Sequence, residues 1–178
     1  MRALLAVGLV AALSVGANAQ DTELKVGDPA PNFSLQASDG KTYQLSDFKG
    51  KQAVVVAWFP AAFTQGCTIE CKSLAQNGDK IRMYDVTYFM ASVDPLEGEQ
   101  GNAAFAKAYN ADFPLLSDPT KETAKAYGVL SPRGFANRWT FYIDMEGRIA
   151  YIDKQVQPKS SAEDMIARLG ALKVPMNH

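Results

Sequence analysis

The two cysteines of the chain, Cys67 and Cys71, stand four residues apart just after a strongly apolar segment. Residues 53–59 are typical of a buried strand, Pro60 ends the strand, and a helix-compatible sequence begins near Thr64. Cys67 is therefore expected in the first turn of a helix that follows a strand. There the free backbone N–H groups and the helix dipole favour a thiolate, the nucleophilic form of cysteine. The sequence predicts a reactive thiol at Cys67.

The first 19 residues have the pattern of a secretory signal peptide. Arg2 supplies a positive start, residues 3–15 are mostly apolar, and the run Ala17-Asn18-Ala19 fits a cleavage site. The apolar run is shorter than the roughly 20 residues of a transmembrane helix. We expect a signal peptide at 1–19 and one domain at 20–178, exported to the periplasm without stable membrane insertion.

Composition excludes several classes of partner. The 178 residues include 18 basic and 19 acidic side chains, for a net charge of −1, and no basic run stands out. Nucleic acid is therefore not an expected partner. No phosphate-binding loop, nucleotide fingerprint or metal-ligand cluster is visible, so neither a cofactor nor a metal is expected. A single domain of this size is long enough to bury a core.

The spacing of the cysteines bears on what the pair does. Two cysteines in an exported protein usually form a structural disulfide. A bridge across three intervening residues would close a very small loop and stabilise little. Residues four apart in a helix have Cα atoms roughly 6 Å apart but nearly parallel Cβ vectors, so bridging requires local unwinding. The pair is more typical of a redox or metal site than of a structural bridge.

Strands and helices alternate along the chain, with a hairpin near each end. The hairpins pair 32–36 with 41–45 around an Asp-Gly turn, and 138–144 with 148–153. Further strands are expected at 53–59 and 85–93, a short extended piece at 113–119, and helices at 64–78, 100–109, 120–127 and 161–172. This order predicts an α/β fold with a mixed central sheet and helices on both of its faces.

The pattern Pro60-x-x-x-Thr64-x-x-Cys67 resembles the active-site signature of the peroxiredoxins. Segments 26–33, 45–51 and 138–144 resemble the N-terminal segment, the loop before the core strand and the arginine-bearing strand of that family, in the same order. Within the family, the chain is most similar to the group named for bacterioferritin comigratory protein. The resemblance implies a thioredoxin fold and a thiol peroxidase that reduces hydrogen peroxide and organic hydroperoxides.

The resemblance also implies a role for each site residue. Cys67 would be the peroxidatic cysteine, whose thiolate attacks peroxide and becomes a sulfenic acid. Thr64 would orient the thiolate and hydrogen-bond the peroxide, and Pro60 would shield the site from water and over-oxidation. Arg138 would approach from a distant strand to stabilise the thiolate and the charge that moves onto the leaving oxygen.

Cys71 departs from the family pattern, because many members of this group carry a resolving cysteine five residues after the peroxidatic one. We expect Cys71 to resolve the sulfenic acid at Cys67 after the helix unwinds. The alternative is a one-cysteine enzyme in which an external thiol attacks Cys67 and Cys71 is only a small buried residue. The expected reductant is a thioredoxin-like or glutaredoxin-like protein, and the expected assembly is a monomer or homodimer.

Two other classes of protein place cysteines on this scaffold. A Sco-type copper chaperone uses a Cys-x-x-x-Cys pair with a distant histidine, but the sole histidine here is His178, the last residue. A thioredoxin-type disulfide oxidoreductase normally has two residues between its cysteines, not three.

Two further side chains are ambiguous. Glu70 either holds Arg138 or is a solvated surface acid, and Trp139 is expected to line the pocket.

Overall fold

The computed structural model of the protein describes residues 23–177. The predicted signal peptide and His178 therefore lie outside the described residues. One seven-stranded sheet runs through the molecule in the order β2-β1-β5-β4-β3-β6-β7. Its strands are β1 (Ser34–Ala37), β2 (Thr42–Gln44), β3 (Ala53–Trp58), β4 (Val86–Ser92), β5 (Leu115–Ser117), β6 (Thr140–Ile143) and β7 (Ile149–Asp153). The three central strands β3, β4 and β5 are parallel, and the other pairs are antiparallel.

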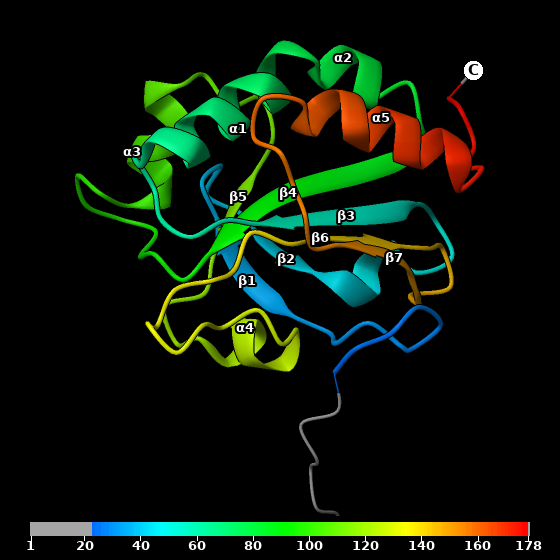
Figure 1. Cartoon of the computed structure of the whole chain (residues 1–178), viewed down its shortest axis with the longest axis horizontal. Helices are drawn as coiled ribbons and strands as arrows, with labels where there is room; N and C mark the ends of the chain where they lie inside the picture. Colours follow the sequence, from blue (N-terminus) through cyan, green and yellow to red (C-terminus); the bar gives the residue numbers. More distant parts are fainter. Residues whose placement is uncertain (1–22, 178) are drawn as a thin grey trace, which may run out of the picture.

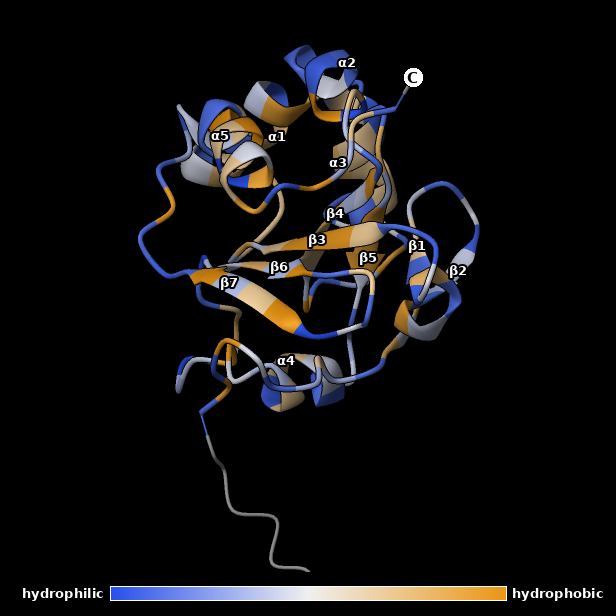
Figure 2. Ribbon diagram, turned by 90° about the vertical axis from the view of Figure 1, so that its right-hand side faces the viewer, coloured by the Kyte–Doolittle hydropathy of each residue, from blue (hydrophilic) through white to orange (hydrophobic). Residues whose placement is uncertain are grey.

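Helices cover both faces of this sheet, as the sequence predicts (Figure 1). Above the sheet lie α1 (Gln65–Gln76), α2 (Gly78–Ile81), α3 (Asn102–Ala108) and α5 (Ser161–Ala171); α4 (Glu122–Ala126) lies below it. A 3₁₀ helix, η1 (Leu45–Phe48), precedes β3. The turned view shows the same layers, with apolar residues along β3 and β5 between them (Figure 2). The expectation of an α/β fold with a mixed central sheet and helices on both faces is confirmed.

The alternation of side chains along β3 explains why the sheet has two cores. Val55, Ala57 and Phe59 point into the cluster under α1, α3 and α5, whereas Val54 and Val56 belong to the cluster on the α4 side. All six β3 residues are buried, as expected for a parallel central strand covered on both faces. Both cysteines lie in the α1-side cluster, so the candidate chemistry is built into the larger core.

Several predicted boundaries differ from the structure by a few residues. The cysteine helix was expected to reach residue 78, but α1 ends at Gln76 and the separate turn α2 follows. Asn77 causes the break, because its side-chain amide donates to the Ser73 carbonyl and caps the last turn. The strand expected from Arg138 begins at Thr140 instead, which leaves Arg138 in the approach to the strand.

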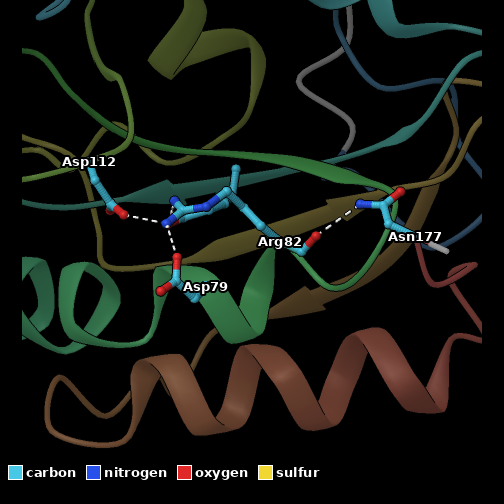
Figure 3. Close-up of polar contacts among 5 residues, drawn as sticks. Asp79, Arg82, Asp112 and Asn177 are labelled. Carbon is cyan, nitrogen blue, oxygen red and sulfur yellow. Dashed lines mark hydrogen bonds and ion pairs between the residues drawn. The ribbon is translucent and has the colours of Figure 1, made fainter.

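An ion cluster forms around Arg82 beside α2, and hydrogen bonds from Asn177 hold the C-terminal tail next to it (Figure 3). The Arg82 guanidinium donates to Asp112 at 2.5 Å and to Asp79 at 2.9 Å. The Asn177 amide donates to the Arg82 carbonyl at 2.9 Å, and the Asn177 backbone N–H donates to the Met83 carbonyl. The segment that follows α1 is therefore tied to both the tail and the loop after α3.

No helix in the described part of the chain has the length and apolar character needed to cross a membrane.

Candidate active site

Cys67 is the third residue of α1 and is fully buried. The backbone of Thr64 occupies the N-cap position, with extended dihedral angles and a carbonyl that accepts from the Thr68 N–H. The thiol thus lies in the first helical turn, where unpaired backbone N–H groups and the helix dipole stabilise an anion. The structure therefore has Cys67 where the sequence predicts it, in the first turn of a helix that follows a strand and a short turn.

Arg138 reaches this thiol from a segment 71 residues away in sequence. β6 pairs antiparallel with β3, and Thr140 lies opposite Ala57 near the end of β3. Arg138 precedes Thr140 by two residues and therefore arrives where α1 begins. Its Nη2 donates to Cys67 Sγ at 3.1 Å. A guanidinium at this distance stabilises a thiolate by a charge-assisted hydrogen bond.

Glu70 lies one helical turn after Cys67, and its Oε2 accepts from Arg138 Nη1. The side chain of Glu70 is about 1% exposed and that of Arg138 18%. Burial raises the pKa of the Glu70 carboxyl to about 7, because desolvation outweighs the stabilising charge and hydrogen bond of Arg138. Of the two interpretations of Glu70, the structure supports the one in which it holds Arg138.

Gly66 makes the approach of Arg138 possible. A Cβ atom at this position would lie 3.2 Å from Arg138 Nη2 and 3.8 Å from a ring carbon of Pro158. The first distance is shorter than ordinary van der Waals contact, so a side chain here would press on the guanidinium. The backbone of Gly66 is helical, so the need for glycine comes from the close approach and not from a left-handed conformation.

Two contacts hold the loop between β3 and α1. The Ala62 N–H donates to Asp94 Oδ2 at 2.8 Å, and Asp94 also accepts from the Ser92 hydroxyl. Phe63 has a φ of 61°, a left-handed conformation that costs a bulky side chain roughly 1–2 kcal/mol. Its ring packs on Phe105 of α3 with ring centroids 5.2 Å apart, which offsets this strain. Asp94 and the Phe63 ring together fix the entry into α1.

Thr64 and Pro60 lie in the same loop, next to the Cys67 turn. The Thr64 hydroxyl donates to the Ala61 carbonyl at 2.9 Å, which locks the turn. Its predicted contacts with the thiolate and with peroxide stay predictions. Pro60 is half-buried between the end of β3 and this turn, and its shielding role is likewise still a prediction. The structure thus brings the three motif residues and Arg138 to one end of β3.

Cys71 lies one turn after Cys67 in α1, in the same apolar cluster, and both thiols are free and buried. Burial, reinforced by the charge of Glu70, raises the pKa of the Cys71 thiol to about 12. Cys71 is therefore a neutral thiol while α1 is intact. Side chains four apart share a helix face, but α1 is continuous from Gln65 to Gln76, so a bridge requires the helix to distort.

Sequence reasoning missed Asp94 and Gly66 and misplaced Trp139. Trp139 packs in the cluster on the α4 side of the sheet, not against Cys67, because neighbouring residues in an extended segment point to opposite faces. Asp94 follows β4, the parallel neighbour of β3. Neighbouring parallel strands end at the same edge of a sheet, so the sequence could have placed Asp94 near Pro60. The sequence does not indicate the role of Gly66, because only the fold shows that Arg138 approaches it.

No group of three or more His, Cys, Asp or Glu side chains suited to holding a metal occurs within residues 23–177. The Sco-type alternative also requires a histidine, and His178 lies outside the described residues. The cysteine pair meets an arginine and a buried glutamate, an arrangement that serves a thiolate nucleophile better than a copper ion.

Residues 26–152 match the AhpC/TSA family. The chain is 35% identical over 136 residues to peroxiredoxin Bcp of Escherichia coli, covering 72% of this chain and 85% of that protein. It is 36% identical over 136 residues to the chloroplastic peroxiredoxin Q of Triticum aestivum, covering 75% and 61% of the two chains. The crystal structure of peroxidoxin BcpB from Mycobacterium tuberculosis superimposes with a TM-score of 0.74 at 27% identity, covering 84% of this chain and 98% of that one.

Proposed function

The chain belongs to the AhpC/TSA family and is a thiol-dependent peroxidase of the bacterioferritin comigratory protein type, and we propose that Cys67 is the thiol that attacks the peroxide. One observation carries this assignment: Arg138 donates to Cys67 Sγ at 3.1 Å in the first turn of α1. The copper-binding and disulfide-exchange alternatives are not favoured, because the related proteins are peroxiredoxins.

In the proposed reaction the Cys67 thiolate attacks one oxygen of hydrogen peroxide or of an organic hydroperoxide. An S–O bond forms, the O–O bond breaks, and the leaving oxygen departs as water or an alcohol once it takes a proton. Arg138 stabilises first the thiolate and then the charge on the departing oxygen. Thr64 orients the peroxide, and Pro60 limits the access of water.

We propose that Cys71 resolves the sulfenic acid. Its thiol attacks Cys67 Sγ, an S–S bond forms and water leaves, and an external thiol then reduces the disulfide. Because Cys71 is buried and neutral in the intact helix, the reaction requires the first turns of α1 to open and expose it. The remaining alternative is a one-cysteine cycle, in which the external thiol attacks Cys67 directly.

Peptide mapping of protein treated with one equivalent of peroxide separates these two cycles. Resolution predicts the loss of both free thiols and a peptide that contains an intramolecular Cys67–Cys71 link. The variant Cys71→Ser then accumulates a sulfenic acid that a dimedone probe labels at Cys67. A wild-type protein that shows the same persistent sulfenic acid, with Cys71 still free, supports the one-cysteine cycle instead.

We also propose that the protein is exported to the periplasm, reduced there by a thioredoxin-like or glutaredoxin-like protein, and active as a monomer or homodimer. The pattern of residues 1–19 supports export, and membership of a thiol-dependent family supports a thioredoxin-type reductant. Cell fractionation with N-terminal sequencing tests the first point: mature protein beginning after Ala19 in the periplasmic fraction is expected, and an intact N-terminus in the cytosol contradicts it.

A further inference from the structure

Three ionisable groups form a buried row at the start of α1. The Arg138 guanidinium lies between two acids, donating through Nη2 to Cys67 Sγ and through Nη1 to Glu70 Oε2. If both acids were ionised, two negative charges would face one positive charge in a largely buried site. A buried excess charge is costly, so the row favours one ionised acid at a time.

The second oxygen of Glu70, Oε1, is buried and has no hydrogen-bond partner among the described residues. A carboxylate would leave this atom both charged and unsolvated, whereas a carboxylic acid carries its proton there. The pKa of Glu70, raised to about 7, agrees with a proton that binds near neutral pH. The geometry and the raised pKa of Glu70 thus both favour a protonated Glu70 beside a Cys67 thiolate.

The other groups around Glu70 do not change this balance. Arg138 is the cation that acts on the carboxyl, and Cys71 on the same helix is a neutral thiol. The side chains of α5 in this cluster, Ala162, Met165 and Leu169, carry no titratable group.

We propose that Glu70 stores the proton that Cys67 loses and releases it when peroxide consumes the thiolate charge. The proposal rests on the assignment of Cys67 as the peroxidatic residue. Before reaction the row holds a thiolate, the Arg138 cation and a neutral Glu70 acid. The thiolate forms an S–O bond as the O–O bond breaks, and the departing oxygen takes up one proton. Glu70 gives up one proton and becomes the carboxylate that balances Arg138 once the sulfenic acid is neutral.

This coupling makes a prediction that separates a stored proton from a permanent carboxylate. In Glu70→Gln the amide oxygen still accepts from Arg138, and the amide is neutral like the protonated Glu70 that it replaces. The pH at which the Cys67 thiolate forms should therefore be the same in Glu70→Gln and in the wild type. If Glu70 were a carboxylate beside the thiolate, its removal would let the thiolate form at a pH lower by on the order of one unit, because two like charges one helical turn apart in a protein interior repel each other.

The test titrates the ultraviolet absorbance of the Cys67 thiolate in the Cys71→Ser background, with and without Glu70→Gln. Glu163→Gln, which removes a charge from an exposed site on α5, is the matched control and is expected to leave the profile unchanged. An unchanged profile in Glu70→Gln supports the proposal, and a shift of the thiolate to lower pH in this variant alone overturns it. This titration uses no peroxide, so a failed peroxidase assignment is recognised separately by slow oxidation of Cys67.

Proton uptake during oxidation supplies a second readout that also serves if Glu70→Gln does not fold. In weakly buffered solution near neutral pH with an indicator dye, wild-type protein is expected to take up close to no protons per Cys67 oxidised, since Glu70 supplies the one required. Glu70→Gln is expected to take up about one more. Uptake of one proton by the wild type would overturn the proposal.

Discussion

Replacing Gly66 with alanine separates the stability of α1 from its chemistry. Alanine is favoured over glycine in a helix by up to about 1 kcal/mol, so Gly66→Ala should not destabilise the helix. The new methyl group would lie 3.2 Å from Arg138 Nη2, so the guanidinium must retreat by a few tenths of an ångström. That atom is the one that donates to Cys67 Sγ at 3.1 Å. The substitution is therefore expected to preserve the fold and weaken the site.

The size of the effect follows from the hydrogen bond that is disturbed. A hydrogen bond to a charged group contributes about 1.5–3 kcal/mol, and losing about half of it corresponds to roughly a tenfold slower oxidation of Cys67. Complete loss sets a ceiling on the order of a hundredfold. The slower oxidation is expected at every peroxide concentration.

The assay is stopped-flow oxidation of reduced protein by hydrogen peroxide, with urea unfolding as the stability measurement. Gln65→Ala, at the neighbouring exposed position in the same turn, is the matched control and is expected to oxidise at the wild-type rate. Wild-type kinetics in a folded Gly66→Ala would show that the close approach of Arg138 is not required, and would refute the reasoning.

Three further predictions concern the surroundings of the site. Glu70 binds its proton more tightly in the folded protein than in the unfolded chain, so its contribution to stability is lost as pH rises from 4.5 to about 7, by about 3 kcal/mol. Urea unfolding of Glu70→Gln should lack this decline, and parallel pH curves for the two proteins would contradict it. Asp94→Ala leaves the Ala62 N–H without its acceptor and should cost about 2 kcal/mol in urea unfolding and slow the oxidation of Cys67; an unchanged oxidation rate would show that Asp94 does not position the loop. Arg82→Ala breaks half-exposed ion pairs, so it should lower the free energy of unfolding by less than about 1 kcal/mol and leave the oxidation rate unchanged. A slower oxidation of Cys67 would link the ion cluster around Arg82 to the site.

The order of strands and helices was predictable because each element has a strong local signal. The valine run in 53–59 and the Asp-Gly turn before Lys41 each specify a structure within a few residues. The placement of Cys67 in a first helical turn followed from Pro60 and the apolar strand before it. Boundaries were less predictable where a side-chain cap decides them, as Asn77 does at the end of α1.

The burial and contacts of individual side chains were not predictable in the same way. Glu70 was compatible with a surface acid or a buried partner of Arg138, and only the pairing of β6 with β3 decides between them. Trp139 was expected in the pocket because it is next to Arg138, but neighbouring residues in an extended segment point to opposite faces of the sheet. The role of Gly66 depends on an atom 72 residues away, which no local pattern encodes.

The central claim is that Cys67 is a peroxidatic thiolate activated by Arg138. Stopped-flow oxidation by hydrogen peroxide of the wild type, Cys67→Ser, Cys71→Ser and Arg138→Met tests it most directly. We predict fast oxidation in the wild type and in Cys71→Ser, no fast phase in Cys67→Ser, and a rate lower by at least tenfold in Arg138→Met. Oxidation as slow as that of an ordinary free thiol in the wild type, or an equally fast reaction without Arg138, would contradict the assignment.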